Sequence, residues 1–156
     1  MKSLVQQIQQ TLLLDEYRLG FTGPRREMNP AQHDSLRTLL QTLPGIQEAH
    51  HGDCVGADTQ FHHLCLEQNI PIHLHPPTDA SHRSFCQGAT FVAEEQGYLK
   101  RNRALVKAAD ILVAVLRTDH EVQRSGIWAS IRYARKARKL TVLVQTDGTA
   151  QLDFPS

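Results

Sequence analysis

The amino-acid sequence predicts an α/β protein with a doubly wound, mainly parallel sheet flanked by helices. Segments typical of strands alternate with segments typical of helices along most of the chain, as expected for successive βαβ units. Residues 111–116 are all apolar, as in a strand that is buried on both faces of a parallel sheet. Glycine-containing loops follow three of the predicted strands, and ligands bind at such strand ends in open parallel sheets.

The N-terminal part of the chain predicts a helical extension, a strand and a well-capped helix. Apolar residues recur at helical spacing within residues 1–15, so this segment is expected to pack as a helix ahead of the main fold. Residues 17–21 predict a short strand. Asn29 and Pro30 then favour a helix start, because an Asn side chain caps free amides and Pro lacks only an amide that would be unpaired anyway.

The rest of the chain continues this alternation. Strands are expected at 46–51, 70–74, 111–116 and 140–144, and helices are expected to begin near Gly56, Tyr98 and Ile127. Residues 78–97 carry few apolar side chains and little periodicity, so they predict a long loop that could cover a site.

Length, composition and charge set limits on the class of protein. A chain of 156 residues fits one domain spanning 1–156, and its 40% hydrophobic and 21% charged residues are typical of a soluble globular protein. The 17 basic and 16 acidic residues give a net charge of +1, so the chain as a whole does not attract nucleic acid or an anionic membrane, and any anion site must be local. No apolar run approaches the roughly 18 residues of a membrane span, and the start does not resemble a signal peptide. A cytoplasmic location is expected.

Three loops at predicted strand ends are candidate anion-binding sites. Glycine lets a backbone approach a ligand closely, and the first turn of the following helix offers unpaired amides and a dipole worth roughly 0.3 to 1 kcal/mol for an anion. A tight turn is the simpler reading of any one such loop, but three at one edge favour binding of a phosphate or ribose phosphate. Neither a Walker A motif nor GxGxxG is present. The candidate binding residues in these loops are Thr22, Gly23, Arg25, Gly52, Asp53, Cys54, Gly56, Thr118, Ser125 and Gly126.

The stretch YLKRNRALVKAAD, residues 98–110, carries a further candidate pair. Arg101 and Asn102 lie on the helix that precedes the most apolar strand. A surface salt bridge would explain Arg101 simply, whereas a guanidinium directed at a phosphate from the strand ends would be functional.

The order of these features resembles the SLOG superfamily of Rossmann-like proteins. TGPR follows the first strand, GDCVGAD the second, YLKRNRALVKAAD precedes the apolar strand, and SGIWASIRYARK precedes the last. The superfamily groups the DNA-processing protein DprA, the cytokinin-activating LOG phosphoribohydrolases and the YspA/YpsA-type proteins, of which the small YspA-type members are most similar. The resemblance covers roughly residues 17–145 and implies that the glycine loops bind a nucleotide or a ribose-phosphate derivative, as a sensor or in nucleotide processing.

The resemblance also bears on catalysis. An arginine of LOG enzymes that binds and cleaves the nucleotide lies nine residues before the acidic residue that begins the apolar strand, and Arg101 lies nine residues before Asp110. LOG enzymes then carry PGGxGTxxE, where this chain has Ser130 in place of the glutamate. A LOG-type N-glycosidase would therefore need another carboxylate. Asp58 or Asp53 could serve as a base or stabilise an oxocarbenium-like centre, although a first-turn Asp58 is also explained by the helix dipole. Asp119 and Glu121 in the last loop are further candidates, and the sequence does not select among these carboxylates.

Histidine and cysteine residues suggest other chemistry only weakly. Adjacent histidines at 50–51 and 62–63 point in different directions, and neither HExxH nor a zinc-type His and Cys spacing occurs. His73 and His75 would share one face of a strand, which fits either a metal or a solvated edge. The sequence therefore predicts no metal and no cofactor.

The three cysteines are odd in number and lack CxxC spacing, so reduced thiols are expected rather than disulfides. Cys54 precedes a predicted helix start, where the pKa of a thiol can be lowered. A small side chain that fits a crowded turn is the simpler explanation.

Two further partner hypotheses concern the last helix. A DprA-like single-stranded nucleic-acid site would use its basic cluster, but a solvated face near a helix C-terminus explains that cluster better. The cluster consists of Arg132, Arg135, Lys136, Arg138 and Lys139. Trp128 and Tyr133 lie on the same helix, and by resemblance to LOG-like proteins they predict a homodimer, although core packing would explain Trp128 equally well.

Overall fold

The chain folds around one seven-stranded sheet. The structure is a computed structural model that describes residues 2–155. The strands lie in the order β4-β3-β2-β1-β5-β6-β7, and all neighbours are parallel except β6 and β7. The strands are β1 (Tyr17–Thr22), β2 (Ile46–His51), β3 (Ile72–Leu74), β4 (Phe91–Val92), β5 (Ile111–Val115), β6 (Leu140–Val144) and β7 (Ala150–Asp153). The predicted α/β fold with a mainly parallel sheet is confirmed.

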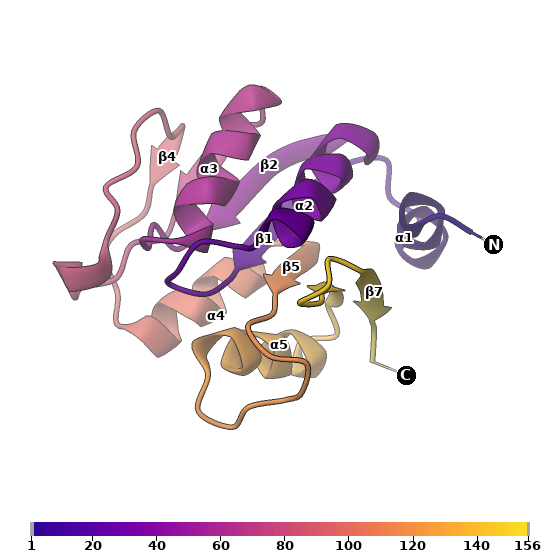
Figure 1. Cartoon of the computed structure of the whole chain (residues 1–156). Coiled ribbons are helices and arrows are strands. Elements are labelled where there is room, and N and C mark those ends of the chain that lie inside the picture. Colours follow the sequence, from indigo (N-terminus) through magenta and orange to yellow (C-terminus); the bar gives the residue numbers. More distant parts are fainter. Residues whose placement is uncertain (1, 156) are drawn as a thin grey trace.

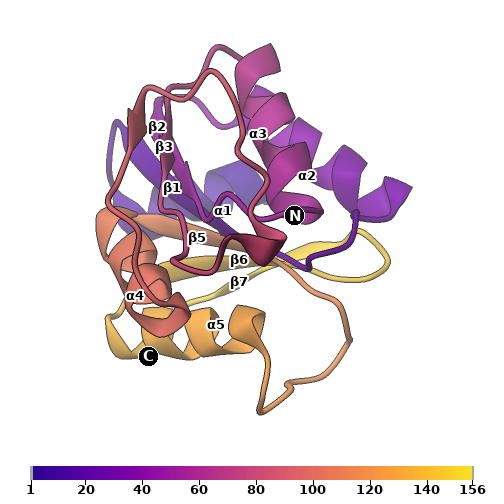
Figure 2. The same cartoon turned by 90° about the vertical axis from the view of Figure 1, so that its left-hand side faces the viewer.

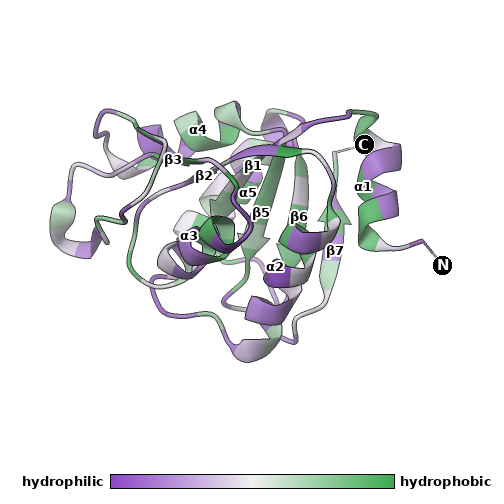
Figure 3. Cartoon of the chain, turned by 90° about the horizontal axis from the view of Figure 1, so that it is seen from above, coloured by the Kyte–Doolittle hydropathy of each residue, from purple (hydrophilic) through white to green (hydrophobic). Residues whose placement is uncertain are grey.

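Helices cover both faces of the sheet. Helices α2 and α3 lie on one face, and α4 and α5 lie on the other (Figure 1). Helix α1 packs beside β7, at the far end of the sheet from β4 (Figure 3). The helices are α1 (Leu4–Leu12), α2 (Pro30–Thr42), α3 (Ala57–Glu67), α4 (Tyr98–Ala108) and α5 (Gly126–Lys136), with a 3-10 turn η1 (Ala80–His82). Among residues 2–155, no helix is both long and apolar enough to cross a lipid bilayer.

The core follows the alternation of side chains along the strands. On β5, Ile111, Val113 and Val115 face α2 and α3, whereas Leu112 and Ala114 face α4 and α5. All five residues of this strand are buried, so the prediction of a strand covered on both faces is confirmed. Strand β6, the neighbour of β5, is likewise buried at every residue, and both strands are coloured mainly as hydrophobic in Figure 3.

Several local predictions are also confirmed. Helix α2 begins at Pro30 behind an Asn29 cap, and the Asn29 and Gln32 side chains each accept a hydrogen bond from the other residue's backbone amide. Helix α1 ends before the predicted residue 15, because Leu13 adopts a left-handed conformation with φ 52°. Strand β3 begins at Ile72 rather than at residue 70, because the amide of Ile70 still bonds the end of α3 through the Cys65 carbonyl.

Two strands were not expected from the sequence. Strand β4 lies inside the predicted loop 78–97 and extends over two residues, too few for a periodic signal. Strand β7 turns back antiparallel on β6 through a turn that contains Gly148 with φ +87°. Both are edge strands, and both depend on a neighbouring strand for their backbone hydrogen bonds.

The topology places a crevice at the centre of the sheet. From β1 the chain proceeds outward to β4, and from β5 it proceeds outward in the other direction to β7. The connections after β1 and β5 therefore diverge, and the crevice between them is the usual ligand position in such sheets. The long connection from β5 to α5 loops out beyond the sheet at this edge (Figure 2).

Candidate functional site

A cavity of about 700 Å³ opens at this divergence. It is bounded by the loops that follow β1, β2 and β5 and by the facing sides of α4 and α5. The sequence-predicted residues among its lining are Thr22, Gly23, Arg25, Gly52, Cys54, Asp58, Arg101, Asn102, Thr118, Ser125 and Gly126. The structure thus brings the three glycine loops and the Arg101–Asn102 pair to one place.

Gly52 is the point at which the loop after β2 meets Arg101. A Cβ on residue 52 would lie 2.5 Å from Nη1 and 2.8 Å from Cζ of Arg101, and 3.2 Å from Oδ2 of Asp58. No side chain larger than hydrogen fits without moving the guanidinium. The close approach of the backbone to this charged group therefore requires glycine.

Arg101 is buried and is held by the protein rather than free in the cavity. Its Nη1 donates to the carbonyl oxygens of Gly52 at 2.7 Å and of His75 at 3.2 Å, and its Nε donates to Oδ1 of Asn102 at 2.7 Å. The bonds to Gly52 and His75 connect α4 to the ends of β2 and β3. The guanidinium thus presents positive charge to the cavity from a fixed position, with few N–H groups left for a ligand.

Asp58 is the single carboxylate among the residues that line the cavity. It is buried at the start of α3, and its Oδ2 accepts a hydrogen bond from the Cys54 amide at 3.1 Å. Burial raises the pKa of this carboxyl to about 6, although the charge of Arg101 acts in the opposite direction. Asp58 can therefore exchange a proton near neutral pH. A carboxylate that only complements the helix dipole would stay charged at this pH and could not do so.

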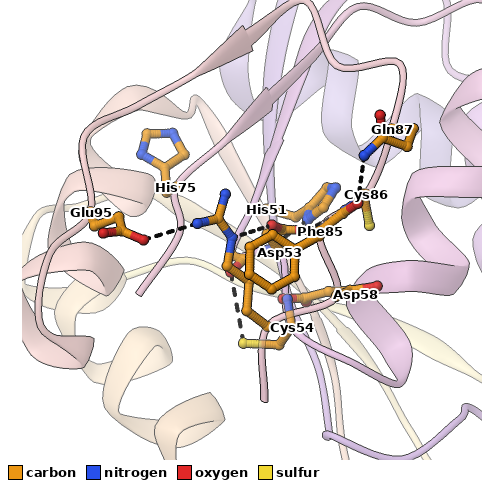
Figure 4. A network of polar contacts seen from close by, with 12 residues as sticks. His51, Asp53, Cys54, Asp58, His75, Phe85, Cys86, Gln87 and Glu95 are labelled. Carbon is orange, nitrogen blue, oxygen red and sulfur yellow. Dashed lines mark hydrogen bonds and ion pairs between the residues drawn. The ribbon is translucent and has the colours of Figure 1, made fainter. Parts of the chain in front are cut away.

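Asp53 and Gly56 were predicted to bind the ligand, but neither lines the cavity. The Asp53 carboxylate instead accepts hydrogen bonds from Nε of Arg83 and from the amide of Cys86, both at 2.9 Å, and Arg83 also contacts Glu95 (Figure 4). Asp53 therefore holds the long segment 78–97 against the loop after β2. The backbone of residue 53 is in the left-handed region, with a φ of 55°.

Gly56 connects two of the loops to each other. It has φ +90°, and a Cβ there would lie 2.3 Å from the carbonyl carbon and oxygen of Arg25. The neighbouring Ala57 amide donates to the carbonyl of Pro24 at 3.0 Å. This glycine therefore lets the loop after β1 pack on the first turn of α3, behind the cavity wall.

Cys54 is not an activated thiol. It lies before α3, but burial and the nearby Asp58 raise its pKa, and the opposing effects of Arg101 and Arg25 are smaller. The lowered pKa that a helix start can cause is absent because the side chain is desolvated. Its small size in a crowded turn is the better explanation.

Several residues of the cavity wall were not expected from the sequence. Arg117 and Arg124 lie in the exposed connection after β5 and join Arg25 and Arg101 around the cavity. Tyr98 contributes an aromatic ring, 5.1 Å from the Cζ of Arg25 and 5.5 Å from that of Arg101. The sequence offered one signal for this part of the wall, namely that Arg117 and Arg124 lie in a loop directly after a buried strand.

The two remaining wall residues of interest are buried. Ser130, where LOG enzymes have a glutamate, is 3% exposed, and Trp128 is 7% exposed in a cluster with Leu116 and Ile127. Trp128 therefore packs within its own chain. It does not offer the apolar surface that the predicted homodimer would use.

Substituting Gly52 tests the contact between the β2 loop and Arg101. Gly52→Ala is expected to lower the free energy of unfolding by about 1–3 kcal/mol, because the new methyl group must displace a buried guanidinium. Gly97→Ala is the control, since a Cβ at residue 97 meets no atom within 4 Å. Urea unfolding of both variants gives the comparison. Equal losses in the two variants would contradict the proposed contact.

The raised pKa of Asp58 predicts a pH-dependent stability difference. Because the folded pKa lies above the ordinary value, ionisation of Asp58 costs stability, and this cost is absent at low pH and complete above about pH 6. Relative to wild type, Asp58→Asn should therefore gain roughly 2–2.5 kcal/mol in unfolding free energy between pH 4 and pH 8. Exposed Asp34→Asn should show no such trend. Unfolding curves at several pH values measure it, and a pH-independent offset for Asp58→Asn would refute the assignment.

Comparison with known proteins shows the fold. No family profile matches the sequence, and no curated protein matches it either. Among solved structures, a molybdenum cofactor binding protein from the phototrophic bacterium Rippkaea orientalis is similar, with 16% identity over 83% of this chain and 77% of that chain and a TM-score of 0.63. A structural-genomics target, TM1055, has 13% identity over 80% of this chain and 71% of that chain, with a TM-score of 0.57.

A third similar structure is DNA processing protein A from Helicobacter pylori, described for its single-stranded DNA binding mode. It has 16% identity over 85% of this chain and 67% of that chain, with a TM-score of 0.56. At these identities the likeness concerns the fold. The chain accordingly shares a Rossmann-like α/β fold with these three structures, as its alternation of strands and helices predicted.

Proposed function

We propose that this chain binds a nucleotide or a nucleotide-derived ribose phosphate in the cavity between α4 and α5, as a sensor or as part of nucleotide processing. The observation that carries the proposal is the charge of the cavity wall. Four arginines line it, at positions 25, 101, 117 and 124, against the single buried carboxylate of Asp58. A cavity with this balance favours an anion.

The backbone around the cavity supports the same ligand class. Gly126 lies at the cavity wall in open space, because a Cβ there would meet no atom within 4 Å. Helix α5 begins at Gly126 behind the Ser125 cap, so its unpaired amides lie at the cavity wall, where helix starts commonly hold phosphate. The ring of Tyr98 offers an apolar face for a sugar or base, and about 700 Å³ is within the range of small-molecule sites.

A nucleotide N-glycosidase of LOG type is the enzymatic form of this proposal. Asp58 would be the acid or base, because no other carboxylate lines the cavity and Ser130 replaces the LOG glutamate. Its pKa of about 6 suits proton transfer near neutral pH. Arg101 would then stabilise the phosphate through its fixed charge rather than through a free bidentate fork.

Single-stranded DNA binding is the alternative that one structural neighbour suggests. The basic cluster on α5 that would serve it is largely engaged within the chain. Arg132 pairs with Glu121 at 3.0 Å, Arg135 pairs with Asp153 at 2.9 Å, and Lys139 donates to the carbonyl of Ala109 at 2.8 Å. These contacts favour the small anionic ligand over a nucleic acid strand. A steep fall of single-stranded DNA affinity with added salt would favour the alternative.

A thermal-shift screen separates these roles. Nucleoside phosphates, ADP-ribose, cyclic nucleotides and ribose 5-phosphate should include a compound that raises the melting temperature, because ligand binding to the folded state stabilises it by mass action. Each stabilising compound is then assayed for released base. Release of base supports the glycosidase, and stabilisation without turnover supports the sensor. Failure of every phosphorylated compound would overturn both.

The two exposed arginines of the cavity provide the mutational test. Arg117→Ala and Arg124→Ala are each expected to weaken binding of the stabilising phosphate compound about tenfold or more, since a charge-assisted hydrogen bond contributes about 1.5–3 kcal/mol. Stability without ligand should not change, because both side chains are exposed. Arg37→Ala, on α2 and outside the cavity wall, is the matched control. Calorimetric titration measures the affinities, and unchanged affinity in both cavity variants would exclude this site.

We also propose that the α4–α5 surface mediates homodimer formation. Leu99 is 65% exposed on α4 and lies with Tyr133 of α5 in a shallow hollow on that surface. Leu99→Glu should therefore convert a dimer into a monomer in sedimentation analysis, while Leu13→Glu, at an apolar residue that is even more exposed and lies at the end of α1, should not. A wild-type chain that sediments as a monomer at all concentrations would refute the dimer.

A further inference from the structure

Two neighbouring strands place four polar side chains together on the face of the sheet that carries α4. Glu48 and His50 are two residues apart on β2, whereas His73 lies on β3 and His75 directly follows the last residue of that strand. The strand register pairs His50 with His73, and their ring centroids are 4.6 Å apart. Four side chains able to bind metal thus project from adjacent strands into one region, separate from the arginine-lined cavity.

The atoms of three of these residues are close enough to share one ion. Oε2 of Glu48 lies 2.5 Å from Nε2 of His50 and 3.6 Å from Nε2 of His73, and all three atoms lie within 4.8 Å of one another. The side chain of His50 is only 5% exposed, whereas those of Glu48 and His73 are 22% and 27% exposed. The group is therefore anchored at its base by a buried imidazole and accessible from solvent at its rim.

We propose that Glu48, His50 and His73 form a binding site for one divalent first-row transition metal ion, with Zn²⁺ as the representative. Two imidazoles and one carboxylate are a common ligand set for such ions and leave a fourth position for water or another ligand. Metal–ligand bonds of about 2.0–2.2 Å place tetrahedral ligand atoms roughly 3.4 Å apart. The Glu48–His73 separation already fits, and the Glu48–His50 separation must widen by about 1 Å as the ion replaces the proton between them.

His75 is placed to orient His50 for this role. Its Nε2 lies 2.8 Å from Nδ1 of His50. When Nε2 of His50 binds a metal, its Nδ1–H can donate to Nε2 of His75, and such outer hydrogen bonds fix the ring and strengthen the ligand. The backbone carbonyl of His75 also accepts from Arg101. The site is thereby joined to the wall of the cavity through a single residue.

A second group, His51, His62 and Cys86, lies on the opposite face of the sheet but is less suited to a metal. The Asp53 amide donates to Nδ1 of His51 at 3.0 Å, so the proton of His51 is on Nε2, which contacts Nδ1 of His62 at 2.9 Å. Nε2 of His62 donates to the carbonyl of Gln87 at 2.6 Å. Every ring nitrogen of His51 and His62 thus has a hydrogen-bond partner. If Nε2 of His51 bound a metal, the proton of His51 would move to Nδ1 and would face the N–H of Asp53, so that two donors would meet.

Zinc titration of the full chain tests the proposal. The protein is prepared without a polyhistidine tag, stripped with a chelator and titrated with Zn²⁺ by calorimetry. Wild type should bind one Zn²⁺ per chain. Glu48→Gln and His73→Ala should each weaken Zn²⁺ binding at least about tenfold. Loss of a residue that only hydrogen-bonds to a metal ligand already costs about 10–100-fold in affinity, so loss of a ligand should cost at least as much. His63→Ala, an exposed histidine on α3, should bind as wild type does.

Two further measurements make the outcome decisive. Cys86→Ala should leave the affinity unchanged, whereas a loss in Cys86→Ala but not in His73→Ala would assign the metal to the other group and overturn the proposal. The absorption spectrum of the Co²⁺-loaded wild type should lack a thiolate charge-transfer band, and the presence of one would overturn it equally. Because this spectrum needs no variant, it decides the question even if His73→Ala fails to fold. Wild-type affinity no greater than that of Glu48→Gln would also refute the site.

Discussion

The hydrogen bonds from the buried guanidinium of Arg101 to the backbone carbonyls of Gly52 and His75 determine how the candidate site is built. Because the charge is buried, these bonds must be kept, and α4 is thereby fixed to the carboxyl ends of β2 and β3. The glycine at residue 52 is required for the guanidinium to come this close. The cavity, the Cys54 turn and the carbonyl of His75 all take their positions relative to this one group.

The same region contains a feature that opposes stability. Asp58 is buried close to Gly52 and Cys54, and its raised pKa means that ionisation costs the folded state free energy. Asp53 is also buried, but its carboxylate is paired with Arg83 and accepts a hydrogen bond from the Cys86 amide, and these contacts hold the segment 78–97 in place. Of the two neighbouring aspartates, one therefore supports the structure and the other remains available for proton exchange at the cavity wall.

The alternation of side chains along β2 assigns its two histidines to different environments. His51 enters the core beside α3, in a chain of hydrogen bonds that uses all its ring nitrogens. His50 points to the opposite face and meets Glu48, His73 and His75. His50 and His51 are adjacent in the sequence, yet each meets different partners on a neighbouring strand or helix.

The sequence by itself determined the alternating strands and helices and the helix start at Asn29–Pro30, because these depend on local periodicity and capping. It also determined the edge of the sheet at which the glycine loops and Arg101 gather, because parallel strands end at one edge. Only the tertiary structure decided that Asp53 turns away from the cavity, that Arg117 and Arg124 join its wall, and that Glu48 lies beside two histidines. Side-chain direction in loops and the register between strands depend on contacts between residues far apart in the chain. No pattern within a single segment records those contacts.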